Sequence, residues 1–132
     1  MIFVDSSFWV GLSARLDDRH RDASALVEAH AQVPLVTSNH IRGETWTFLR
    51  ARYGHRAAAQ FLDAVQRTIR LRVVFIDEPL EDEAWAWLRR HDKRAYSFVD
   101  ATSFALMRRL RIREALAFDG DFAAAGFVEL RP

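Results

Sequence analysis

The chain has 132 residues, of which 50% are apolar and 12% aromatic, enough to bury the core of one domain, which we expect to span residues 1–132. Charged residues make up 28% of the sequence and the formal net charge is +1, which is typical of a globular protein and excludes a disordered chain. The absence of cysteine excludes disulfides and thiolate metal sites, so a metal ion would need oxygen or imidazole ligands.

Localisation and ligand class are constrained only loosely. The N-terminal run Met1–Asp5 has no basic segment and is too short for a signal peptide, and no stretch approaches the ~18 apolar residues of a membrane span. We therefore expect a cytoplasmic protein. Of the 19 basic residues only Lys93 is a lysine. Arginine binds phosphate in a bidentate way, which suits an RNA ligand, but codon bias in a GC-rich genome explains the same excess.

The first half of the chain alternates short β-prone runs with helical patterns. We predict strands at 2–4 and 35–37, and helices that begin after a cap at Ser6 or Ser7, at about 21, after a cap at Ser38 or Asn39, and at about 55. In the third helix we expect Ile41, Thr45, Phe48 and Leu49 to face inward, and in the fourth Ala58, Phe61, Leu62, Val65 and Ile69.

The second half repeats the alternation. We predict strands at 73–76, 115–118 and 127–130, helices at about 80–91 and 98–110, and a short helix at 122–125. Val73–Ile76 is continuous, apolar and bounded by charge, which is typical of a strand buried on both faces. Strands that alternate with helices indicate an α/β domain with a mainly parallel sheet.

Four carboxylates stand at positions where a ligand site is expected. Asp5 and Asp119 each directly follow a predicted strand, and in a parallel sheet ligands collect at the carboxyl ends of the strands. Glu44 lies on the stripe of its helix that should be buried, and Asp100 lies in the first turn of a helix beside apolar residues. Burying an isolated charge is costly, so these acids need a partner.

A divalent cation would supply that partner. Four carboxylates in one cleft raise each other's pKa by repulsion, and a bound Mg²⁺ or Mn²⁺ reverses this cost. Such an ion also lowers the pKa of a bound water and neutralises charge on phosphoryl oxygens, which is the chemistry of phosphodiester hydrolysis.

Each acid also has a purely structural explanation. Asp5 is a possible N-cap, and Glu44 is a possible solvent-exposed residue tilted off the buried stripe. Ser97 and Asp100 have capping-box spacing, and Asp119 before Gly120 fits a turn. Asp121 fits the cap of the short helix that follows. The prediction of a metal site therefore depends on the joint pattern.

The same segments resemble the PIN-domain family, in particular the VapC-type toxins of bacterial toxin–antitoxin pairs. The matching motifs follow one another in the family's order and spacing over the whole chain: Ile2–Ser7, Thr37–Ser38 leading to Glu44, Tyr96–Ala101, Phe118–Phe122 and Gly126–Phe127. One such motif would be a weak indication, whereas several in register are specific.

The resemblance implies a three-layer α/β/α domain with strand order 3-2-1-4-5 and an Mg²⁺- or Mn²⁺-dependent endoribonuclease that cleaves structured RNA, often tRNA or rRNA. The family's acidic quartet falls on Asp5, Glu44, Asp100 and Asp119. Ser7 and Ser97 match hydroxyl positions near the metal, and Asp121 matches a variable acidic position. The resemblance also implies a homodimer and a cognate antitoxin that inhibits the toxin by placing a peptide in the active-site groove.

Two other functions are compatible with parts of the sequence. Asp119-Gly120-Asp121 after a strand superficially suits a phosphotransferase with an aspartyl nucleophile, but that chemistry normally uses an Asp pair after the first strand and a downstream lysine. A non-catalytic regulator with the PIN fold, binding RNA or protein, is the main alternative, and the intact quartet weighs against it.

Several other residues have open roles. The five histidines lack metal-ligand spacing, and we expect solvated or capping roles for them. Trp46 lies off the stripe of its helix and is a candidate for an exposed partner or RNA contact. The basic cluster Arg89, Arg90, Lys93 and Arg94 is either a solvated face or a track for RNA.

Overall fold

The computed structural model describes all residues from 1 to 132. The helices are α1 (Ser6–Ser13), α2 (His20–Ala29), α3 (Asn39–Tyr53), α4 (His55–Arg67), α5 (Glu78–Arg90), α6 (Phe98–Leu110) and α7 (Asp121–Ala124). The strands are β1 (Ile2–Val4), β2 (Leu35–Ser38), β3 (Leu71–Val74), β4 (Glu114–Leu116) and β5 (Val128–Glu129). The predicted alternation of strands and helices is confirmed, with boundaries displaced by at most two residues.

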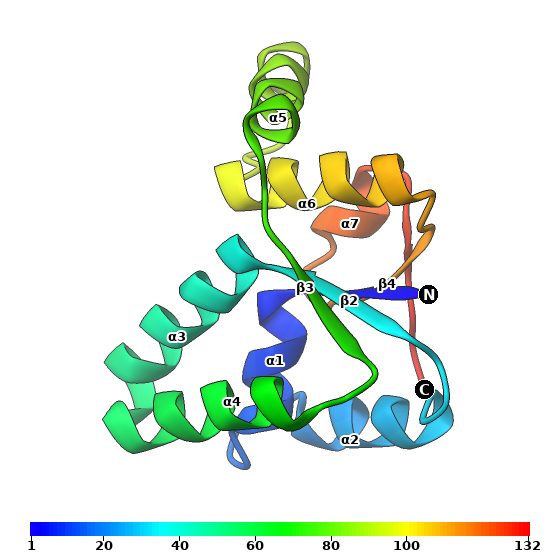
Figure 1. The fold of residues 1–132 in the computed structure, drawn as a ribbon. Coiled ribbons are helices and arrows are strands. Elements are labelled where there is room, and N and C mark those ends of the chain that lie inside the picture. Colours follow the sequence, from blue (N-terminus) through cyan, green and yellow to red (C-terminus); the bar gives the residue numbers. More distant parts are fainter.

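The five strands form one sheet in the order β3-β2-β1-β4-β5, and every neighbouring pair is parallel. The expected α/β class and strand order are therefore confirmed. In Figure 1 the sheet lies between α6 and α7 on one face and α1, α2 and α4 on the other, and α5 packs along the outer side of α6. None of the helices has both the length and the apolar character required to cross a bilayer.

Strand β1 is the centre of the fold. Its residues Ile2, Phe3 and Val4 are buried, and it pairs with β2 on one side and β4 on the other. The Thr37 hydroxyl in β2 donates a hydrogen bond to the Val4 carbonyl oxygen, which fixes the carboxyl end of β1 beside that of β2. A parallel arrangement brings the carboxyl ends of the strands to one edge. The residues that follow β1 and β4 therefore meet there.

The prediction for the third strand was wrong in position and in burial. Strand β3 covers Leu71–Val74 instead of 73–76, and it is partly exposed because it lies at the edge of the sheet with only β2 beside it. Phe75, beyond its end, is 66% exposed. A run of β-branched residues indicates a strand, but it does not show how many neighbours that strand has.

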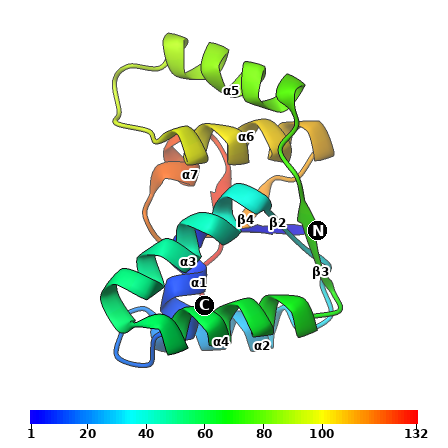
Figure 2. The same cartoon turned by 60° about the vertical axis from the view of Figure 1, so that its left-hand side comes forward.

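Helices α3 and α4 form a hairpin joined at Gly54, whose positive φ of 96° suits glycine (Figure 2). The Ser38 hydroxyl caps α3 by accepting from the Ile41 amide. Two residues expected inside this hairpin are exposed, since Phe48 is 45% and Ile69 is 101% exposed. Ile69 lies past the end of α4, and Phe48 lies at the edge of the stripe formed by Ile41, Thr45 and Leu49, where it lines a cavity with Glu44.

Candidate active site

Asp5 stands at the centre of the predicted site, directly after β1. It is 1% exposed, and its carboxylate accepts hydrogen bonds from the Ser7 amide at 3.1 Å and the Ser7 hydroxyl at 2.7 Å. Asp5 is therefore the N-cap of α1, and the predicted cap at Ser6 or Ser7 was wrong. The capping role leaves the Asp5 carboxylate at the carboxyl end of β1, where Asp119 and Asp100 act on it electrostatically.

The pKa of the Asp5 carboxyl is raised from 3.8 to about 8. Burial is the largest cause, and the charge of Asp119 adds to it, while the hydrogen bonds from Ser7 oppose it. Asp100 makes a smaller contribution of the same sign. Without a cation at the site, burial and the neighbouring carboxylates thus keep the Asp5 carboxyl protonated near neutral pH.

Asp100 reaches the same edge from the first turn of α6. Ser97 and Asp100 form a complete capping box, in which the Asp100 amide donates to the Ser97 hydroxyl and the Ser97 amide donates to the Asp100 carboxylate. Burial raises the pKa of Asp100 to about 6, and the charges of Asp121 and Asp119 add to this effect. The capping box accounts for an aspartate at position 100, but the Asp100 carboxylate still lies near those of Asp119 and Asp121.

Asp119 lies in the loop between β4 and α7, and Asp121 is the first residue of α7. Carboxylate oxygens of Asp100, Asp119 and Asp121 all lie within 4.8 Å of one another, close enough to ligate one ion. The Asp121 amide donates to the Asp119 carboxylate at 3.1 Å, which fixes the turn. Loss of hydration is the largest cause that raises the pKa of Asp119, and the charges of Asp121 and Glu129 contribute.

Arg94 is a site residue that the sequence placed only in a general basic cluster. Its Nε donates to the Asp121 carboxylate at 2.7 Å, and its Nη2 donates to the Asp119 carbonyl oxygen at 3.4 Å. Asp5, Asp100 and Asp119 have no ion pair with a basic side chain. Arg94 therefore neutralises only Asp121, and the carboxylates of Asp5, Asp100 and Asp119 remain without a basic partner.

Glu44 lies at a different place from the one predicted. It is exposed on α3 instead of lying on the buried stripe, because the buried positions of this helix are Ile41, Thr45 and Leu49. Its Oε2 accepts a hydrogen bond from the Ser6 hydroxyl at 2.8 Å, and it lines one cavity together with Asp119. Glu44 thus borders the acidic cluster without belonging to the group of three that shares one ligand position.

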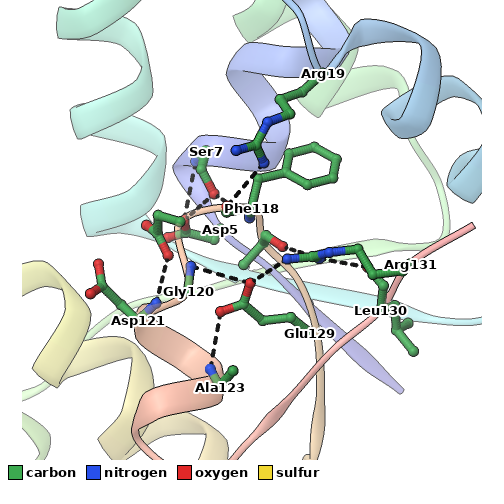
Figure 3. A network of polar contacts seen from close by, with 12 residues as sticks. Asp5, Ser7, Arg19, Phe118, Gly120, Asp121, Ala123, Glu129, Leu130 and Arg131 are labelled. Carbon is green, nitrogen blue, oxygen red and sulfur yellow. Dashed lines mark hydrogen bonds and ion pairs between the residues drawn. The ribbon is translucent and has the colours of Figure 1, made fainter.

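A partly buried hydrogen-bond network holds these loops in place (Figure 3). The Ser7 hydroxyl donates to Asp5 and accepts from the Phe118 amide at 3.0 Å, so it couples α1 to the end of β4. The Glu129 carboxylate accepts from the Gly120 and Ala123 amides and pairs with Arg131. Sequence reasoning missed Glu129, since a single acid in a terminal strand has no distinctive pattern.

The remaining sequence predictions concern residues outside the acidic cluster. None of the five histidines belongs to it. Trp46 is partly buried and meets His55 edge-on, so it is not the freely exposed aromatic that the pattern allowed. Trp9 and Trp87 are buried in the core, as expected.

The residues at this edge suit a divalent cation. The group offers only carboxylate oxygens, which are the ligands that Mg²⁺ and Mn²⁺ prefer. Burial raises the pKa of Asp5, Asp100 and Asp119, the charges of neighbouring acids raise it further, and Arg94 offsets only the carboxylate of Asp121. A cation would remove this repulsion. The acidic cluster can therefore bind a metal ion.

Comparison with known proteins gives one consistent result. The model of the PIN domain matches residues 2–128. The "23S rRNA-specific endonuclease VapC20" from two strains of Mycobacterium tuberculosis is 54% identical over 132 residues, which cover 100% of this chain and 99% of the relative. A crystal structure of that organism's VapC20, described as a sarcin–ricin loop cleaving toxin, superposes with a TM-score of 0.95 at 53% identity and covers 100% of both chains. The chain belongs to the PIN domain family.

Proposed function

We propose that this protein is a toxin endoribonuclease that cleaves the sarcin–ricin loop of 23S rRNA. The observation that carries the proposal is the 54% identity to VapC20 over the full length of the chain. At this level of identity, and with both chains covered, the relative's substrate is the natural first candidate. The cluster of uncompensated carboxylates supports a nuclease over a regulator that only holds RNA.

The proposed catalytic residues are Asp5, Glu44, Asp100 and Asp119, and the proposed metal is Mg²⁺ or Mn²⁺. Asp100 and Asp119, with Asp121 beside them, offer oxygens within 4.8 Å of one another, and Asp5 acts electrostatically on Asp119. Ser7 and Ser97 are proposed as positioning residues, because each donates to one of these carboxylates or accepts from its backbone.

The proposed division of labour follows from burial and contacts. Asp5, Asp100 and Asp119 would hold the ion, and Ser7 fixes the orientation of the Asp5 carboxylate. When bound, the divalent cation supplies charge neutralisation at the phosphoryl oxygens and makes a coordinated water more acidic. Glu44 is exposed to solvent and held at Oε2 by Ser6, so it can orient the attacking water and accept its proton.

The biological setting is also a proposal. A toxin of the VapC type implies a cognate antitoxin as partner, and we propose that the protein acts in the cytoplasm, where rRNA is found. We further propose a homodimer, and a single PIN domain over residues 1–132. The match of the family model to residues 2–128 supports the single domain.

The direct test is cleavage of a short hairpin RNA that carries the sarcin–ricin loop. The wild-type protein should cut it at one position in the presence of Mg²⁺ or Mn²⁺ and should be inactive in EDTA. Asp100→Asn should lose at least about 100-fold in rate while its folding is retained. Intact activity in EDTA would refute the metal dependence, and full activity of Asp100→Asn would refute the site. Binding without cleavage would favour the non-catalytic alternative.

A further inference from the structure

A cavity of about 530 Å³ continues from the acidic cluster along α3. At one end it is lined by Glu44 and Asp119. Farther along, Phe48, Arg52 and Tyr53 line it from α3. We call this cavity the α3 groove. Its volume lies in the range of pockets that hold small organic ligands.

The walls of the α3 groove combine aromatic rings with guanidinium groups. Phe48 is 45% exposed, although a ring of this size normally gains stability by burial in the core. The Arg52 guanidinium lies 5.7 Å from the centre of the Tyr53 ring, and Arg19 on the opposite wall lies 5.1 Å from the centre of the Phe118 ring. The α3 groove therefore offers flat apolar faces with positive charge next to them.

Neither the Arg19 nor the Arg52 guanidinium forms an ion pair with a carboxylate. The ion pairs of the protein involve Arg94, Arg109 and Arg131 only. Arg19 donates one hydrogen bond through Nη1 to the Phe118 carbonyl oxygen at 2.9 Å, which holds the side chain against the groove wall (Figure 3). Asp17 and Asp18 also line the groove, and Asp17 accepts from the Arg19 amide. The Arg19 guanidinium, held in this way and without an ion pair, is suited to phosphate oxygens.

We propose that the α3 groove binds one unpaired nucleotide of the RNA, next to the phosphate that is cleaved. This inference rests on the proposed ribonuclease function. The base stacks on Phe48 and the flanking phosphates meet Arg52 and Arg19, while the scissile phosphate reaches Asp119 and its neighbours. Only a splayed-out base fits, because bases inside an A-form helix have their faces covered. The groove thereby selects an RNA loop over a duplex.

The test compares two matched aromatic substitutions. Phe48→Ala removes the proposed stacking surface, and Phe75→Ala is the control, since Phe75 is also exposed, lies under the Arg42 guanidinium and is outside the α3 groove. Single-turnover cleavage of the sarcin–ricin hairpin should slow by about 5- to 150-fold for Phe48→Ala, the range expected for one stacked base. Phe75→Ala should cleave at the wild-type rate.

A second readout identifies the base and does not need cleavage. Hairpins with 2-aminopurine at successive loop positions report stacking by loss of fluorescence when Asp100→Asn, the inactive variant, binds them. One position next to the cleavage site should be quenched, and adding Phe48→Ala should abolish the quenching while adding Phe75→Ala should not. Replacing that nucleotide by an abasic one should slow cleavage by the wild-type protein. Cleavage by Phe48→Ala should not become any slower, because its stacking surface is already absent.

The outcomes separate the two proposals. If the wild-type protein does not cleave the hairpin, but Phe48→Ala abolishes the quenching and Phe75→Ala does not, the proposed function is refuted and the nucleotide site in the α3 groove is supported. If the hairpin is cleaved and Phe48→Ala behaves like Phe75→Ala in both readouts, the nucleotide site is refuted. It is also refuted if Phe48→Ala keeps full cleavage but is no longer inhibited by the antitoxin, because the groove would then serve a protein partner.

Discussion

Replacing Asp5 by asparagine should stabilise the metal-free protein at alkaline pH, although it removes the central acid of the site. The asparagine keeps an oxygen that accepts from Ser7, and it is as good an N-cap as aspartate. What disappears is a buried charge that faces Asp119 and Asp100. The change therefore isolates the electrostatic cost of assembling the acidic cluster.

The sign and size follow from the pKa of Asp5. A carboxyl whose pKa is 3.8 unfolded and about 8 folded binds more protons in the folded state, so stability falls as pH rises between these values. Between about pH 5.5 and about pH 8 the loss is about 3 kcal/mol, at about 1.4 kcal/mol per pH unit while only the unfolded state is ionised. This is an upper limit, because water entering the site would lower the folded pKa.

Urea unfolding followed by tryptophan fluorescence measures the effect in EDTA. The stability of the wild-type protein relative to Asp5→Asn should fall by up to about 3 kcal/mol over this pH range. At the higher pH, Mg²⁺ at 100 times its Kd should raise the free energy of unfolding of the wild-type protein by about 2.7 kcal/mol. The same concentration should stabilise Asp5→Asn much less. Parallel pH profiles for the two proteins would refute the raised pKa of Asp5.

Three further predictions concern residues around the site and in the core. Ser7→Ala leaves the Phe118 amide without its acceptor and Asp5 without one donor, so it should cost about 1–2 kcal/mol of stability in urea titration and slow RNA cleavage; unchanged cleavage would contradict its positioning role. Arg94→Gln removes a positive charge that competes with the cation at Asp121, so calorimetry should show several-fold tighter Mg²⁺ binding, not weaker. Phe104→Ala should cost about 3–5 kcal/mol in urea, and a loss below about 1 kcal/mol would mean that its fully buried ring is not tightly packed.

The sequence alone was enough to place the backbone of the acidic site. Asp5 and Asp119 each follow an apolar run that can only be a short strand in this pattern, and parallel strands bring their carboxyl ends together. The capping box of Ser97 and Asp100 is local, since its spacing of three residues is set by one turn of helix. Features of this kind are predictable because neighbouring residues in the chain determine them.

Burial and partner choice needed the tertiary structure. The pattern of β3 resembles that of a central strand, yet this strand has one neighbour only. Glu44 and Phe48 were assigned to a buried stripe, but both are exposed and line the cavity beside α3. Arg94 meets Asp121 across 27 positions of sequence. Such contacts depend on how elements distant in the chain are oriented. Hydrophobic periodicity is a local pattern and does not predict that orientation.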